Sequence, residues 1–338
     1  MFKLKVPGEY SEKYHYSRYG NPTRNILEDA LAAMDNAKYA VALCSRTAAQ
    51  MAVFSILNPG DLVVFSDILN CQKFQKLYPM LLMTTINFDD KKIFEQSFPS
   101  NAKMIFIESS NLFQTFLDVK FIADFIHTKS KAIFVVDNTF QTSHLQKPLN
   151  FGADIVVYSL NEYIGGHDDV NMGSVSINDT NYYEKLRHYQ ISSGTVPSPI
   201  DCFMINRSLK TFHIRMERCL KNSEEVGKFM EKHEKVEKVF KNFTDSTHCE
   251  YSGILSFKLK ERFNIFDTFS SLLKFIKTSE TFGGIDTKIS HPWSMSHAVF
   301  PKQKRLDVGI TESFMKLSIG LEQSTDIIKD LKQALDQV

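Results

Sequence analysis

The chain has 338 residues, of which 43% are hydrophobic and 23% charged, and its formal net charge is +1. This composition is typical of a globular protein, and the near-neutral charge argues against binding to nucleic acid or to an anionic membrane surface. There is no run of about 18 apolar residues to predict a transmembrane helix. The five scattered cysteines form no C-x-x-C pair and predict neither a disulfide framework nor a zinc site, so we expect a cytoplasmic protein without a bound metal.

The first part of the chain has the pattern of an α/β protein. An amphipathic helix is predicted from apolar residues at helical spacing within residues 26–34. From about residue 24 to residue 176, helical stretches alternate with short apolar runs, which predicts a parallel sheet flanked by helices. The runs expected to form strands, several of them apolar at consecutive positions, are residues 62–65, 104–107, 132–136, 155–158 and 174–177.

The last third of the chain has a different pattern. Residues 199–233 follow two prolines and predict one long helix with a strongly charged later half. Beyond it, a smaller unit is expected, with strands at residues 253–259 and 315–319 and helices at residues 265–275 and 326–335. We therefore expect two domains that share a long connecting helix.

Polar residues follow two of the predicted strands. Asp137 comes directly after the apolar run 132–136, and a polar loop that contains two glycines follows the run 155–158. Ligands of open parallel sheets bind beyond the carboxyl ends of the strands. An acid at a strand end is also often only a turn or helix-capping residue, so the position alone leaves both interpretations open.

Short blocks spread over nearly the whole chain match the motifs of one enzyme family. Residues 16–24 read Y-S-R-Y-G-N-P-T-R, residues 135–140 read V-V-D-N-T-F, and residues 165–173 read G-G-H-D-D-V-N-M-G. Residues 196–202, 209–216 and 316–322 continue the series in order. The blocks resemble those of the cystathionine γ-lyase and γ-synthase family, the trans-sulfuration enzymes of cysteine and methionine metabolism that depend on pyridoxal 5′-phosphate (PLP).

This resemblance implies an architecture and an assembly. The fold would be α/β, fold type I of the PLP-dependent transferases, with a large doubly wound, mostly parallel-sheet domain and a smaller α+β C-terminal domain. Residues 24–215 would form the large domain, residues 216–338 the small domain, and residues 1–23 a shortened interface arm. Tyr16 and Arg18 would reach the phosphate in a neighbouring subunit, which implies a homodimer or homotetramer.

The resemblance also implies roles for individual residues. Asp137 would pair with the pyridinium nitrogen of PLP and keep it protonated, so that the ring can act as an electron sink. Backbone N–H groups at a helix start near Ser45 and Arg46 would hold the phosphate. The other implied cofactor-binding residues are Thr139, Ser159, Asn161 and Leu69, and the implied substrate-binding residues are Asn111, Thr281 and Lys316.

The sequence departs from the family at the catalytic position. The family motif S-x-T-K ends on the lysine that attaches PLP covalently, whereas this chain reads Ser159-Leu160-Asn161-Glu162. A carboxylate cannot condense with an aldehyde, and it cannot replace the amine as a nucleophile. A negative charge about 6 Å from Asp137 would cost roughly 2–3 kcal/mol at an effective dielectric near 20. Alternatively, burial would favour the protonated form of one carboxyl group.

Four more of the implied site residues differ from the family pattern. Arg46 replaces the glycine of the phosphate loop, where it could bind phosphate or fill the cavity. Leu69 replaces the aromatic residue that stacks on the PLP ring. Lys316 replaces the arginine that clamps the substrate carboxylate in a bidentate fork. Thr281 replaces a serine, and the loop at Asn111 is about one residue shorter.

These departures lead to three hypotheses about function. In the first, the chain is a pseudoenzyme that has lost the ancestral reaction, the cleavage of cystathionine to cysteine, 2-oxobutyrate and ammonia. In the second, it is a regulatory subunit that assembles with an active paralogue. In the third, it is an enzyme with altered chemistry that holds PLP non-covalently, with Glu162 or His167 as the proton carrier.

Overall fold

The computed structural model describes residues 14–113, 116–241, 251–260 and 265–338. Most of the predicted arm and Cys249 therefore lie outside the described residues, and the four cysteines within them are free thiols. The chain divides into unit 1, residues 1–111 and 117–210, and unit 2, residues 112–116 and 211–338. The domain limits expected from the sequence remain a prediction. Within the described residues, no helix has the length and apolar character needed to cross a membrane.

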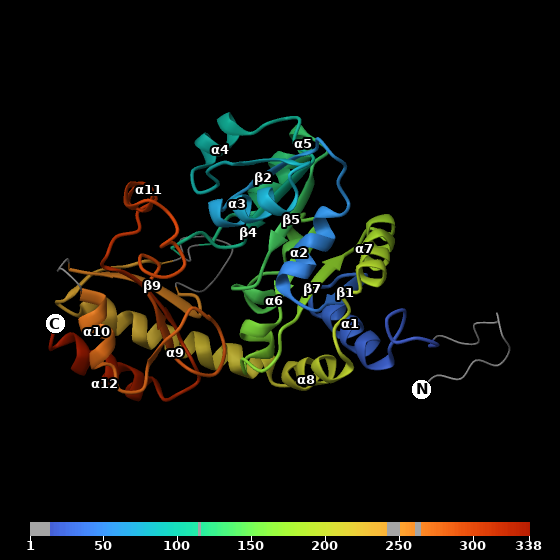
Figure 1. Ribbon diagram of the computed structural model, residues 1–338. Coiled ribbons are helices and arrows are strands. Elements are labelled where there is room, and N and C mark those ends of the chain that lie inside the picture. The colour runs from blue at the N-terminus through green and yellow to red at the C-terminus, as the bar shows by residue number, and fades with distance from the viewer. Residues whose placement is uncertain (1–13, 114–115, 242–250, 261–264) are drawn as a thin grey trace. The chain divides into compact units, whose positions relative to one another are not determined.

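Unit 1 contains a seven-stranded sheet in the order β1-β7-β6-β5-β4-β2-β3 (Figure 1). Strands β3, β2, β4, β5 and β6 are parallel to one another, whereas β7 runs antiparallel to both of its neighbours. The strands are β1 (Tyr39–Leu43), β2 (Leu62–Phe65), β3 (Leu82–Thr85), β4 (Met104–Glu108), β5 (Ile133–Asp137), β6 (Ile155–Ser159) and β7 (Gly173–Ile177). This mixed, mostly parallel sheet confirms the fold class predicted from the sequence.

Helices cover the sheet of unit 1. One face is packed by side chains of α2, α3 and α7, and alternate strand residues such as Val64 and Phe134 are buried on the other face. Because both faces are covered, the central strands are apolar at consecutive positions. The helical segments of unit 1 are α1 (Pro22–Met34), α2 (Arg46–Phe54), α3 (Ile68–Leu77), α4 (Lys91–Ser97), α5 (Val119–Lys129), α6 (Thr142–Leu145), η1 (Pro148–Phe151), η2 (Asn161–Gly165), α7 (Thr180–Ser193) and α8 (Pro199–Leu209).

The prediction of a single long helix over residues 199–233 is wrong. The structure has two helices there, α8 and α9 (Phe212–Lys232), separated at Lys210 and Thr211. The N–H of Lys210 bonds back only three residues, and Thr211 has a φ of −115° with a ψ of 4°. The buried residues Ile205 and Phe212 are in helical phase across this break, so the apolar pattern could not reveal it.

Unit 2 contains a five-stranded sheet in the order β10-β11-β12-β9-β8. This second sheet and its helices confirm the predicted α+β character of the C-terminal part of the fold. The predicted helix at residues 265–275 ends earlier, at Leu272. The elements of unit 2 are α9, β8 (Val236–Val239), β9 (Ile254–Leu259), α10 (Ile265–Leu272), β10 (Lys277–Thr278), β11 (Lys288–Ser290), α11 (Lys302–Asp307), β12 (Phe314–Ser318) and α12 (Ser324–Leu335).

Candidate functional site

The candidate site lies at the carboxyl edge of the sheet in unit 1. Asp137 is the last residue of β5, and Glu108 is the last residue of the adjacent parallel strand β4, directly opposite it. Ser159 ends β6 on the other side of β5. Because parallel strands end at the same edge, residues far apart in the sequence meet where ligands of such sheets bind.

The N-terminus of α2 places the side chain of Arg46 at this edge of the sheet. Ser45 caps the helix by accepting a hydrogen bond from the N–H of Ala48 at 3.0 Å, and Arg46 is the first helical residue. The backbone of Gly173, the first residue of β7, lies so close that a Cβ there would overlap the carbonyl oxygen of Ser45. A glycine is needed here because it lets the helix start approach the strand.

The Arg46 side chain forms ion pairs with both strand-end acids. Its Nε and Nη2 each lie 2.8 Å from Oδ2 of Asp137, and Nη2 also lies 2.7 Å from Oε1 of Glu108. Its guanidinium pKa lies above the ordinary value, because the charges of Asp137, Glu108 and the nearby Glu162 outweigh the opposing effect of burial. This geometry engages the guanidinium with two carboxylates of its own chain.

The carboxylate of Asp137 is surrounded by donors from its own chain. Oδ2 accepts from Arg46 and, at 3.2 Å, from Nε2 of Gln50. Oδ1 accepts from the N–H of Thr139 at 3.2 Å and from its hydroxyl at 2.6 Å. The side chain is only 1% exposed. Since each carboxylate oxygen offers about two acceptor positions, the hydrogen-bonding capacity of Asp137 is filled.

Glu162 lies in the short segment η2, just after β6. Its φ of −70° and ψ of −124° depart from helical values, and Gly166 closes the segment with a φ of 78°. Its Oε2 atom has no hydrogen-bond partner. Burial raises the pKa of this carboxyl group above its ordinary value, and the charge of Asp137 adds to the increase, although Ser159 and Arg46 act in the opposite direction. Burial therefore makes the charged form of this carboxyl group less favourable than it would be in water.

Ser159, Asn161 and Leu69 lie in unit 1. The N–H of Ser159 donates to the hydroxyl of Thr139 at 2.9 Å, which links β6 to the Asp137 cluster. Oδ1 of Asn161 accepts from the N–H of Met172 at 2.9 Å and therefore holds the loop before β7. Leu69 is half-buried in the first turn of α3. Their predicted roles in cofactor binding remain predictions.

The sequence analysis missed three residues that complete the cluster, namely Glu108, Gln50 and Asn70. Glu108 ends an apolar strand, which is the same signal that identified Asp137, and that signal could have found it. Gln50 lies on the buried side of α2, and Asn70 donates to Glu108 at 3.0 Å from α3. No sequence pattern distinguished these two amides from ordinary helix residues.

The remaining predicted residues lie elsewhere in their units. Arg18 donates to the carbonyl of Ile191 at 2.7 Å and stacks near Tyr16, which is 53% exposed. Asn111 donates to Asp89 at 2.8 Å. In unit 2, Lys316 is buried on β12, and Thr281 accepts a hydrogen bond from Lys288 at 3.1 Å. The structure does not test their predicted roles.

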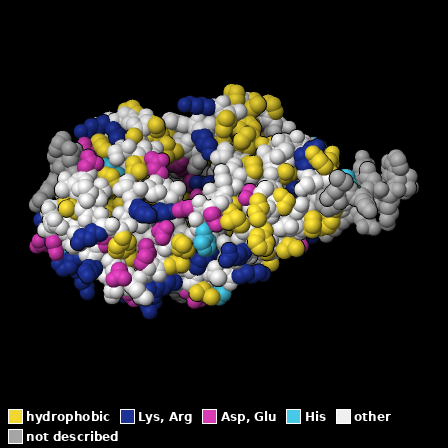
Figure 2. All heavy atoms as spheres, turned by 60° about the horizontal axis from the view of Figure 1, so that its bottom comes forward, with side chains coloured by type: hydrophobic (Ala, Val, Ile, Leu, Met, Phe, Trp, Pro, Cys, Tyr) yellow, Lys and Arg dark blue, Asp and Glu magenta, His cyan; other side chains and the backbone are white. Residues whose placement is uncertain are grey.

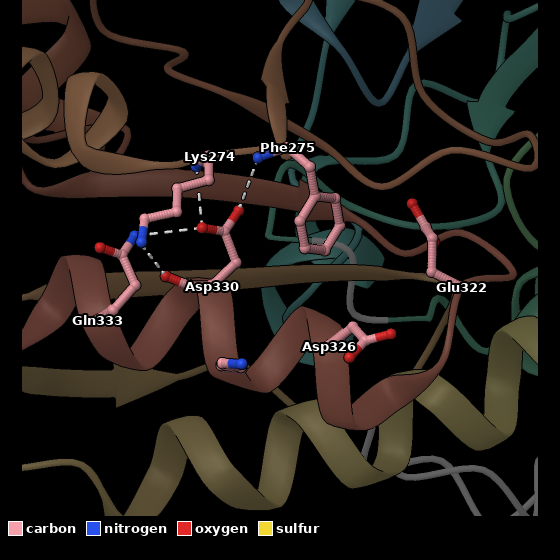
Figure 3. Close-up of a pocket in the computed structure, with 7 residues that line it drawn as sticks. Lys274, Phe275, Glu322, Asp326, Asp330 and Gln333 are labelled. Carbon is pink, nitrogen blue, oxygen red and sulfur yellow. Dashed lines mark hydrogen bonds between the residues drawn. The ribbon is translucent and has the colours of Figure 1, made fainter.

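Unit 2 also has a pocket of about 420 Å³ (Figure 3). Asp330 accepts hydrogen bonds there from the backbone N–H groups of Lys274 and Phe275, at 2.8 and 3.1 Å. This carboxylate anchors the turn after α10, and its charge is satisfied by that structural role. The pocket is lined by Lys274, Phe275, Glu322, Asp326, Lys329, Asp330 and Gln333.

Comparisons with known proteins agree on one family. Residues 2–336 match the family of Cys/Met metabolism PLP-dependent enzymes. The cystathionine gamma-lyase of Macaca fascicularis is 37% identical to this chain over 351 residues, which cover 99% of this chain and 86% of the relative. That of Dictyostelium discoideum is 35% identical over 355 residues, which cover 99% and 90%, respectively.

Solved structures give the same result. The cystathionine gamma-lyase of Lactobacillus plantarum, in complex with L-serine, superposes with a TM-score of 0.92 at 27% identity, covering 99% of this chain and 91% of that chain. The cystathionine gamma synthase of Xanthomonas oryzae pv. oryzae, in complex with cystathionine, also has a TM-score of 0.92, at 29% identity, with 99% and 90% covered. The class is therefore that of the fold type I trans-sulfuration proteins. The chain belongs to the Cys/Met metabolism PLP-dependent enzyme family.

The family implies PLP as the cofactor, but two positions of this chain do not fit it. By the resemblance of residues 159–162 to the family motif, Glu162 is expected at the position where covalent attachment requires an amine. Asp137, which would have to accept a hydrogen bond from the protonated ring nitrogen, has its accepting oxygens taken by Arg46, Gln50 and Thr139. The residues present at this edge of the sheet therefore do not fit PLP.

Proposed function

We propose that this chain is a cystathionine γ-lyase-like member of the trans-sulfuration family that has lost the lyase reaction. The proposal rests on the carboxyl group of Glu162, which lies in η2 just after β6, at the position that the family motif gives to the Schiff-base lysine. The lyase reaction needs an amine that bonds to the cofactor, leaves it to the substrate and then moves the α-proton. A carboxyl group could accept a proton but could not perform the first two tasks.

The proposal is tested by incubating purified protein with PLP and cystathionine and measuring 2-oxobutyrate and cysteine. We expect no product above the background of PLP alone in solution. An active cystathionine γ-lyase assayed alongside shows that the conditions support the reaction. Product formation that scales with the amount of this protein would overturn the proposal.

A second candidate function is that of a regulatory subunit for an active paralogue. The observation that favours it is the exposure of Tyr16 in a chain whose own Asp137 is already engaged. In the family pattern, Tyr16 and Arg18 act across a subunit interface, so they could complete a partner's site although this chain's own site lacks lysine. Co-expression with an active γ-lyase should then give mixed oligomers, and Tyr16→Ala should lower the activity of the mixed species but not that of the pure paralogue.

The third hypothesis, altered chemistry with non-covalent PLP, receives less support. It requires Asp137 to be available to the cofactor ring, whereas Arg46 occupies that carboxylate. For the chain by itself we propose a homo-oligomer in the cytoplasm, either a dimer or a tetramer.

A further inference from the structure

We infer that Arg46 acts as a built-in counter-ion that replaces the positively charged cofactor ring at Asp137 and thereby excludes PLP from this site. This inference rests on the proposed function, because it explains how the site stays folded without the cofactor of the family. It assigns the exclusion to Arg46 rather than to the missing lysine.

The first argument is geometric. A protonated ring nitrogen bound to Asp137 would be a cation that donates one hydrogen bond to a carboxylate oxygen. The guanidinium of Arg46 already provides a cation and two N–H donors, both within 2.8 Å of Oδ2. With Gln50 on the same oxygen and Thr139 on the other, a second cation could bind only by displacing Arg46.

The second argument concerns charge. Three carboxyl groups, those of Asp137, Glu108 and Glu162, act on the Arg46 guanidinium. If the guanidinium left, the acids at the ends of β4 and β5 would face each other across one strand spacing without a cation between them. Displacing Arg46 would therefore break two ion pairs in order to form one.

The third argument is that the guanidinium is held in place. Arg46 starts a nine-residue helix that is capped by Ser45 and lies against Gly173. Its guanidinium lies 5.9 Å from the ring centre of Phe140, on the segment that follows Asp137. Only 26% of its side chain is exposed. An arginine fixed at both ends of its side chain is preorganised for this ion pair.

The inference predicts how the family's cofactor site can be restored. Glu162→Lys alone supplies an amine but leaves Asp137 engaged, and it places a second cation near the guanidinium. Arg46→Gly restores the residue type of the family motif and frees Asp137, but supplies no amine. Covalently held PLP should therefore require both substitutions.

The experiment titrates PLP into wild type, Glu162→Lys, Arg46→Gly and the double variant. It measures visible absorbance and the shift of Tm with PLP, neither of which depends on lyase activity. We expect no Tm shift for wild type or Glu162→Lys and a PLP-dependent Tm increase for Arg46→Gly. The double variant should show the absorbance of lysine-bound PLP, with an apparent Kd at least about tenfold below that of Glu162→Lys.

Gln50→Ala is the matched control, because it removes a neutral donor from the same Asp137 oxygen and leaves the guanidinium in place. It should not admit PLP. Arg46→Gln serves as a second variant if the glycine variant does not fold. The inference is overturned if wild type or Glu162→Lys binds PLP as tightly as the double variant, or if the folded double variant does not bind it. PLP binding by Glu162→Lys alone would overturn this inference and leave the proposed loss of lyase activity standing.

Discussion

At the residue scale, the proposed replacement of the family lysine by Glu162 changes the charge of the site. The family lysine would be a cation near Asp137, whereas Glu162 adds an acid to a cluster that already has two. One arginine compensates for this change in charge.

Replacing Glu162 with glutamine should stabilise the fold at neutral and alkaline pH. The pKa of this carboxyl group lies above its ordinary value of 4.5 in the folded state, chiefly because of burial. The stability provided by the protonated form is present below pH 4.5 and is lost as the pH rises through the folded pKa. Urea unfolding at pH 4 and pH 8 should show the variant more stable than wild type only at pH 8. An equal difference at both pH values would contradict the prediction.

Asp35 should impose a second pH dependence, independent of the site. It is 1% exposed, and burial raises its pKa from 3.8 to about 6. The tyrosine hydroxyl of Tyr158 donates to Oδ1 at 2.5 Å, while Oδ2 has no partner. Because the pKa of Asp35 is raised in the folded state, the protein loses stability as the pH rises from about 4 to about 6. The loss is at most on the order of 3 kcal/mol.

Asp35→Asn tests this directly, since an amide keeps the acceptor for Tyr158 and carries no charge. The variant should be more stable than wild type at pH 7.5, and the difference should shrink toward pH 4. Chemical unfolding across this range measures it. If the variant is less stable than wild type at pH 7.5, the folded protein stabilises the charged form of Asp35, and the prediction is wrong.

At the scale of elements, the contact between α2 and β7 positions Arg46. Gly173→Ala should destabilise the fold by about 1–3 kcal/mol, because the new Cβ would overlap the Ser45 carbonyl and force the start of α2 to move. Thermal unfolding measures the loss. Ser174→Ala on the same strand is the control: it removes a buried hydroxyl without a hydrogen-bond partner and should be close to neutral. Equal effects of the two variants would argue against the close approach.

The elements also show where sequence patterns succeed and fail. The strands β2, β4, β5 and β6 were predicted because each is a run of apolar residues buried on both faces. The half-exposed edge strand β3 has no such run and was not predicted. The break between α8 and α9 was missed because the apolar residues on either side of it stay in helical phase, so their spacing does not reveal it.

At the scale of the whole molecule, an apolar surface on unit 1 is available for assembly. Helices α1 and α8 pack against each other and expose Ile26, Ile200 and Phe203, which are 62%, 62% and 55% exposed. Figure 2 views the molecule from the side where these helices lie, and hydrophobic side chains gather there. Isolated apolar residues are common on surfaces, but neighbouring ones favour an interface.

Phe203→Asp should shift the protein toward smaller species in analytical ultracentrifugation, because a charge at the centre of an apolar contact would have to be desolvated. Leu77→Asp, at a residue 50% exposed on α3, is the control and should leave the assembly unchanged. If neither variant changes the sedimentation coefficient, α1 and α8 do not form the interface.

The sequence by itself determined the family, the α/β fold and the acid at the end of β5, because motifs and apolar runs are local features. Only the tertiary structure decided what Arg46 does. Its partner Asp137 is 91 positions away, and Glu108 joins them because parallel pairing brings the ends of β4 and β5 to one edge. The target of a long charged side chain depends on neighbours brought together by folding, and no local pattern records it.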